Sequence, residues 1–237
     1  MNGGNCSCEI SNQPQRLSRW GINKTAVHEG DATEEDREKR TWATAISYVT
    51  VPPIVALLMF ALINSTVSTG LSFVVLMLLT IFFAVLMPLS ILIIWARRTH
   101  APDLDISGMT ERSQPLLVAT VSFSIGTVVL LLIRAPALTT TIMLGYSVGT
   151  LFIFFVNLRW KISAHAMGIA GPTIVLLFVF GPWGVLLGLF LPLVIWSRVY
   201  LKKHTLAQAL AGSVAGFVLA AFGLWLVFVY SAPFAVQ

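Results

Sequence analysis

The sequence predicts an all-α membrane protein, a polytopic transmembrane helical bundle of about seven spans, with six also compatible. Of its 237 residues, 57% are hydrophobic and 11% are charged. The apolar residues form runs long enough to cross about 30 Å of hydrocarbon at roughly 20 residues per run. Nearly all the charge lies outside these runs. This pattern is typical of a helical membrane protein and not of a soluble domain.

The chain begins with a polar segment, residues 1–41, which we predict to be a disordered tail. It is rich in Gly, Asn, Ser and charged residues and includes the mixed block Glu29 to Arg40. Such a segment cannot bury enough apolar surface to form a core. Its two cysteines, Cys6 and Cys8, have no other metal ligands nearby, so we expect ordinary thiols. We predict no metal and no organic cofactor.

Residues 42–237 form the predicted transmembrane domain. The predicted spans are 44–65, 71–96, 115–133, 136–157, 164–181, 183–197 and 205–230. Three of the connections are short and nearly uncharged, at 64–70, 134–136 and 181–184. The other three, at 97–114, 157–163 and 198–204, are long or basic.

This alternation predicts an orientation. With seven spans, the tail and the three polar connections lie on one side of the bilayer, and Arg134 is the one residue of fifteen Lys and Arg on the other. Basic residues in short loops favour the cytoplasmic side, so we predict a cytoplasmic polar face in the cell membrane. The net charge of +5 therefore reflects topology. The predicted partner is the lipid bilayer and not nucleic acid, and the sequence sets no oligomeric state.

The orientation rule does not explain two histidines, one just after the second polar connection and one at the end of the third. His165 follows a basic segment and lies just after Ser163, a good N-cap residue. Free backbone N–H groups and the helix dipole favour an anion at such a position. In the next polar connection, a tight link separates Arg198 from His204, so a guanidinium and an imidazole can converge on one group. We predict a phosphate site built from both connections.

Gln208 stands four residues after His204, on the same face of the predicted helix. Its amide oxygen is placed to accept a proton from one ring nitrogen of the histidine. We therefore count Gln208 among the candidate catalytic residues.

These residues resemble motifs of a known family. Ser163-Ala164-His165 and Ser197-Arg198-x5-His204-x3-Gln208 are similar to the second and third motifs of the type 2 phosphatidic acid phosphatase superfamily, which are Pro-Ser-Gly-His and Ser-Arg-x5-His-x3-Asp. The resemblance covers roughly residues 97 to 230. It implies a metal-independent hydrolase of phosphate or diphosphate monoesters of lipids, isoprenoid or glycerolipid, that works through a phosphohistidine intermediate.

The resemblance also implies roles for individual residues. His204 would be the nucleophile, held by the residue at 208, and His165 would be the general acid. Arg198 and Ser163 would stabilise charge on the phosphoryl oxygens. Gln208 replaces the family's aspartate, which predicts a slower nucleophile because an amide does not stabilise an imidazolium charge.

The family's first motif, Lys-x6-Arg-Pro, has an altered counterpart. Asp105-x6-Arg112 has the spacing, with Asp in place of Lys, and Arg112 is a candidate phosphate clamp. Lys161, close to His165 in sequence, is a candidate for the missing lysine.

Two other functions stay open. A degenerate homologue would bind a lipid phosphate without cleaving it, and Gln208 motivates that alternative. A magnesium-dependent membrane prenyltransferase would use paired acids such as Asp103-x-Asp105, although only one such loop is present.

Overall fold

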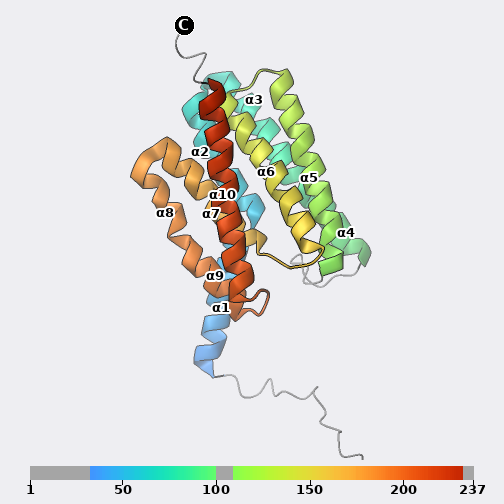
Figure 1. Ribbon diagram of the computed structural model, residues 1–237. Helices are drawn as coiled ribbons and strands as arrows, with labels where there is room; N and C mark the ends of the chain where they lie inside the picture. The colour runs from blue at the N-terminus through green and yellow to red at the C-terminus, as the bar shows by residue number, and fades with distance from the viewer. Residues whose placement is uncertain (1–32, 100–108, 232–237) are drawn as a thin grey trace, which may run out of the picture. The chain divides into compact units, whose positions relative to one another are not determined.

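The computed structural model describes residues 33–99 and 109–231, and all regular structure within these ranges is helical. The chain divides after Arg37, and the residues from Glu38 onward form one compact unit (Figure 1). The elements in order are α1 (Glu34–Val49), α2 (Pro52–Val67), α3 (Gly70–Ile81), the π-helical turn η1 (Phe82–Leu86), α4 (Met87–Thr99), α5 (Met109–Leu132), α6 (Ala137–Asn157), α7 (Ala164–Phe180), the 3₁₀ turn η2 (Gly181–Gly184), α8 (Val185–Gly188), α9 (Phe190–Tyr200) and α10 (Leu206–Ser231). The all-α class is confirmed.

Several helical segments of the described chain are long and apolar enough to cross a membrane. There are five of them: Gly70–Ile91, Ser113–Leu132, Ala137–Asn157, Ala164–Tyr200 and Leu206–Phe228. Helices α1 and α2 pass the same test together as one bent span, which makes up to six. The chain is therefore a helical membrane protein. The predicted count of seven spans is not confirmed.

Helix α1 begins earlier than the predicted tail allows. The Thr33 hydroxyl accepts the backbone N–H of Asp36 at 3.2 Å, and Glu34 and Glu35 add further negative charge to the first turn. An N-cap oxygen and acidic residues both stabilise a helix N-terminus. The segment 34–41, predicted as part of the disordered tail, is therefore helical.

A bend of 49° separates α1 from α2. Pro52 and Pro53 open α2, and Val51 before them is extended, with φ −63° and ψ 141°. Proline disfavours helical geometry in the residue that precedes it, so the helix breaks there and restarts. The predicted first span, 44–65, is therefore two helices at an angle.

The long helix from α3 to α4 contains a π-helical turn just before Pro88. The N–H of Met87 bonds the carbonyl of Phe82, five residues back, and this wider turn accommodates the proline ring. Helix α5 docks on the same turn, where the Ser122 hydroxyl donates to the Phe83 carbonyl at 2.7 Å. A Cβ atom at Gly126 would lie 2.7 Å from the Phe83 Cβ, so only glycine permits this approach.

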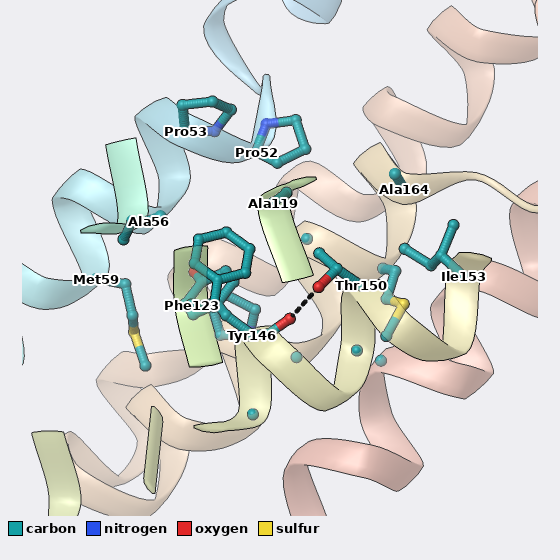
Figure 2. A pocket seen from close by; sticks show the side chains of 18 of the residues that line it. Pro52, Pro53, Ala56, Met59, Ala119, Phe123, Tyr146, Thr150, Ile153 and Ala164 are labelled. Atoms are coloured by element: carbon teal, nitrogen blue, oxygen red, sulfur yellow. Dashed lines mark hydrogen bonds between the residues drawn. The ribbon is translucent and has the colours of Figure 1, made fainter. Parts of the chain in front are cut away.

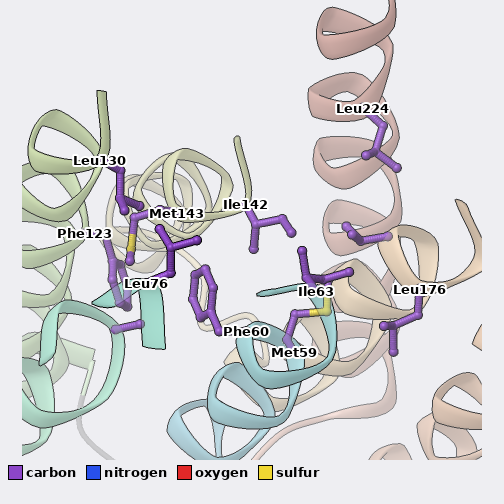
Figure 3. Close-up of a cluster of buried hydrophobic side chains, with 12 residues drawn as sticks. Met59, Phe60, Ile63, Leu76, Phe123, Leu130, Ile142, Met143, Leu176 and Leu224 are labelled. Carbon is purple, nitrogen blue, oxygen red and sulfur yellow. The ribbon is translucent and has the colours of Figure 1, made fainter. Parts of the chain in front are cut away.

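Helices α5 and α6 run antiparallel and are joined by hydroxyl groups. Thr120 donates to Thr150 at 3.0 Å, and the hydroxyls of Ser124 and Ser147 bond at 2.7 Å. Such interhelical hydrogen bonds supplement packing where water is absent. An apolar core lies beside them among α2, α3, α5, α6, α7 and α10 (Figure 3). Its buried members include Met59, Phe60, Ile63, Leu76, Phe123, Leu130, Ile142, Met143, Leu176 and Leu224.

The apolar segment Ala164–Tyr200 folds back on itself. A Cβ atom at Gly184 would collide with the backbone of Leu177, and one at Gly188 would lie 2.9 Å from the Thr173 methyl group. Gly184 thus packs against Leu177, and Gly188, further along the chain, packs against the earlier residue Thr173. Helices α8 and α9 therefore run antiparallel to α7. Both ends of the segment consequently lie at the same end of the bundle.

Helices α7 and α10 pack closely through small residues. A Cβ atom at Gly212 would collide with the carbonyl oxygen of Ser163, and one at Gly216 would lie 2.7 Å from that of Met167. Small residues let helix backbones approach in this way. The small-residue stretch of the last span is therefore a packing face, and it fixes where α10 begins relative to α7.

Candidate functional site

Arg198 is the largest fully buried side chain, with 1% of its surface exposed. It lies in the last turn of α9, and its Nη1 donates to the Ser47 hydroxyl of α1 at 2.7 Å. The neighbouring Ser197 hydroxyl donates to the Ala43 carbonyl at 2.6 Å. These two bonds attach α1 to α9. A buried guanidinium requires compensation, so this end of the bundle is built around a positive charge.

A tight turn places His204 beside Arg198. Lys202 has φ 54° and Lys203 donates its N–H to the Arg198 carbonyl at 3.0 Å, which is the Schellman ending of a helix. The His204 N–H reaches the same carbonyl at 3.2 Å. The His204 side chain is 6% exposed, and both ring nitrogens are shielded from solvent. The predicted proximity of Arg198 and His204 is therefore present in the backbone.

Gln208 has a structural task that the sequence analysis missed. Its Oε1 accepts the Thr205 N–H at 3.0 Å, and its own N–H donates to the Thr205 hydroxyl at 3.3 Å. This reciprocal pair is a capping box, which satisfies backbone donors at the start of α10. The amide oxygen predicted to hold the His204 ring is thus engaged by the helix cap, because the Thr-x-x-Gln spacing brings it back to Thr205.

We expect Gln208→Glu to fold as well as the wild type, because glutamate is equally suited to the third position of a capping box. Its added negative charge near His204 would preserve or raise lipid phosphate hydrolysis. Gln208→Ala is the matched control and should lose about 1 kcal/mol of stability with the cap. Melting temperature and free-phosphate release measure the two effects. A large fall in rate at an unchanged melting temperature would assign Gln208 another role.

Ser163 and Lys161 join the second polar connection to the third. The Ser163 hydroxyl accepts the Ala166 N–H at 3.3 Å as the N-cap of α7, so the predicted cap is confirmed. Its backbone N–H donates to the Gln208 carbonyl at 3.1 Å. Lys161 Nζ donates to the Lys203 carbonyl at 2.9 Å. These bonds hold the two loops together. The roles of Ser163 and Lys161 in phosphate binding stay predictions.

His165 lies in the first turn of α7 and lines a cavity of about 390 Å³. Helices α1, α2, α5, α6, α7 and α10 all contribute to the lining, which is mostly apolar. Figure 2 shows the rings of Phe123 and Tyr146 on one side of the cavity and Ile153 and Ala164 on the other. Ser47 also lines it, so the group that accepts a bond from Arg198 faces the same space as His165.

His165, Arg198 and His204 thus lie at the same end of the unit. They differ in whether they line the cavity. The described residues that line the cavity include His165 and Ser47 but neither Arg198 nor His204, and Arg198 donates a hydrogen bond to Ser47. Ser47 was missed by sequence analysis. Its one signal was a hydroxyl one helical turn after Ala43, on the face of α1 that contacts α9.

The first motif lies largely outside the described residues, which include neither Asp103 nor Asp105. Arg112 falls in the first turn of α5, and its side chain is also outside the described part. Its role as a phosphate clamp stays a prediction.

Comparison with family models, curated proteins and solved structures gives no match. The class of protein therefore follows from the fold alone. The fold is that of a helical integral membrane protein, with the buried guanidinium of Arg198 near one end of a mostly apolar cavity.

Proposed function

We propose that this protein is an integral membrane lipid phosphatase that hydrolyses a phosphate or diphosphate monoester of an isoprenoid or glycerolipid at the cytoplasmic face. The observation that carries the proposal is the junction of Arg198, Ser47 and His165 at one end of an apolar cavity. An amphiphile with a phosphate head matches both parts, because the anion needs the cationic end and the tail needs the apolar lining.

The proposed chemistry has two steps. A neutral ring nitrogen of His204 attacks the terminal phosphorus, and a P–N bond forms as the P–O bond to the leaving group breaks, which is the lipid alkoxide of a phosphate or the lipid phosphate of a diphosphate. Protonated His165 gives its proton to the departing oxygen. Water then attacks phosphorus while His165 takes up its proton, the P–N bond breaks, and inorganic phosphate leaves. Arg198 stabilises the negative charge on the phosphoryl oxygens throughout.

The packing of the loops supports a common site for these groups. Ser163 bonds the backbone of Gln208, and Lys161 bonds that of Lys203. The turn before α10, the first turn of α10 and the residues that lead into α7 are therefore fixed relative to one another. Catalytic groups need this kind of fixed placement, since small displacements cost large factors in rate.

The test is direct. Purified full-length protein is given polyprenyl and glycerolipid phosphates and diphosphates, and free phosphate is measured with and without excess EDTA. We expect phosphate release that survives chelation of divalent cations. Release that depends strictly on magnesium would instead favour the prenyltransferase-like alternative with Asp103 and Asp105. Absence of release across the panel overturns the phosphatase.

The capping box favours one second candidate, a protein that binds a lipid phosphate without cleaving it. Position 208 carries an amide, and its oxygen is engaged by the backbone of Thr205. A phosphohistidine mechanism benefits from a carboxylate at this position, which stabilises the imidazolium charge. Measurable binding of lipid phosphates together with no turnover in the same panel would support this candidate.

A further inference from the structure

The cavity beside His165 extends along α7. Its lining follows this helix from Ala164 to Val175, which spans roughly 16 Å at 1.5 Å per residue. The lining is mostly apolar, and the volume is about 390 Å³. A hydrocarbon chain is complementary to a cavity of this length and lining.

The two ends of the cavity differ in chemistry. At one end lie His165 and Ser47, and Ser47 accepts its bond from the buried Arg198. Beyond them the lining becomes apolar, and the hydroxyl of Thr150 is engaged by the Tyr146 carbonyl at 2.8 Å. A ligand with an anionic end and a hydrocarbon tail is complementary to this gradient.

Gly145 of α6 marks an opening of the cavity. It lines the cavity and is itself exposed, and a Cβ atom added there would have no atom within 4 Å. On either side of Gly145, α6 is in contact with another helix. Thr141 lies 3.8 Å from a Cβ atom placed at Gly223 of α10, and a Cβ atom at Gly149 would lie 3.0 Å from Met167 of α7. The neighbouring Leu144 is 46% exposed and lies in the middle of the apolar span Ala137–Asn157. The opening therefore leads to the bilayer.

Glycine at position 145 is not required by packing. Glycine inside a helix costs about 0.5–1 kcal/mol relative to alanine, and here nothing occupies the space that a side chain would take. A side chain at this position would lean toward the preceding turn, where Thr141 and Ile142 line the cavity. The effect of glycine here is to keep the cavity open.

We propose that a hydrocarbon chain of a lipid phosphate enters from the bilayer at Gly145 and lies inside the bundle, with the phosphate at His165 and the Arg198–Ser47 pair. The proposal rests on the function proposed above and adds where the hydrocarbon chain of its substrate lies.

The test uses alkyl phosphonates, which bind without being hydrolysed, and alkyl phosphates of the same chain lengths. Purified full-length wild type, Gly145→Phe and Ala221→Phe are compared with chains of 6 to 16 carbons. Ala221 lies on the exposed face of α10, so its variant adds the same ring outside the cavity. We expect Gly145→Phe to lose about tenfold of the preference for long over short chains, because a ring in the opening would displace about two methylene groups at about 0.8 kcal/mol each. Ala221→Phe should keep the wild-type profile.

The two proposals fail separately. Phosphonate binding that prefers long chains in the wild type and not in Gly145→Phe, without hydrolysis of any phosphate, supports the chain site and overturns the phosphatase. Hydrolysis with the same chain-length profile in all three proteins overturns the chain site and leaves the phosphatase.

A second measurement needs no bulky side chain. Gly145→Cys, made with Cys6→Ser and Cys8→Ser, carries a single thiol at the opening. A phosphonate of 12 carbons should slow the reaction of this thiol with an apolar maleimide several-fold, and one of 6 carbons should not. Equal labelling rates with both phosphonates would contradict a chain at Gly145.

Discussion

Hydrolysis of lipid phosphates is expected to fall at least about a thousandfold in His204→Ala, because removal of the nucleophile abolishes the covalent route. The variant should still fold. The bond from residue 204 to the Arg198 carbonyl comes from the backbone N–H, which alanine retains. Loss of a buried ring costs a few kcal/mol at most. Free-phosphate release and melting temperature, measured on the same preparation, separate catalysis from stability.

Lys202→Gly is the matched control in the same turn. Lys202 is exposed and has φ 54°, a conformation that glycine adopts without strain. We expect this variant to hydrolyse at the wild-type rate and to melt at the same or a higher temperature. His204→Ala with full activity would remove the phosphohistidine step from the proposal, whereas equal losses in both variants would point to the turn and not to the imidazole.

The positions of the membrane helices were predictable because the chain marks them clearly. Apolar runs end at Gly, Pro or basic clusters, and the predicted spans 136–157 and 164–181 coincide with α6 and α7 to within a residue. The break in the helix before Pro52 was not predicted, because the apolar run continues through it and hydropathy does not detect a bend within an apolar run. The start of α1 at Glu34 was missed because a charged sequence was taken as disordered, although it carries good capping residues.

The number of spans was less predictable than their positions. Sequence analysis split residues 164–200 at Gly181 and Pro182, and the structure does reverse there, with Gly184 against Leu177. Whether each arm of a reversed segment crosses the bilayer depends on depth, which hydropathy does not encode. Residues 164 and 200 lie at the same end of the bundle. The other spans therefore keep the same orientation whether or not the two arms of this segment cross the bilayer.

The candidate site was partly predictable for a related reason. Short-range features such as the Ser163 cap and the approach of Arg198 to His204 follow from local sequence. The contact between Arg198 and Ser47 joins residues 151 positions apart, and no local sequence pattern predicts such a contact. Helical spacing gave Gln208 two possible partners. The structure shows its oxygen on the backbone N–H of Thr205, and its role beside His204 stays a prediction.

The site therefore depends on how closely α10 packs on α7, and Gly212 controls that approach. A Cβ atom at this position would collide with the Ser163 carbonyl oxygen. We expect Gly212→Ala to be destabilised by about 2–3 kcal/mol and Gly212→Leu by more, since rigid backbone cannot yield as a side chain does. The displacement would also strain the bond from the Ser163 N–H to the Gln208 carbonyl, and so separate the His165 helix from the His204 turn.

Two other glycines make the prediction specific. Gly223→Ala places its Cβ at an ordinary 3.8 Å from Thr141 and should leave stability within about 1 kcal/mol of the wild type. Gly126→Ala places its Cβ 2.7 Å from the Phe83 Cβ and should destabilise the fold, yet it lies away from the histidines. Melting temperature should therefore fall for both Gly126→Ala and Gly212→Ala, while kcat, measured below the melting range, should fall only for Gly212→Ala. If Gly212→Ala melts and turns over like Gly223→Ala, the close approach of α7 and α10 does not hold the site together.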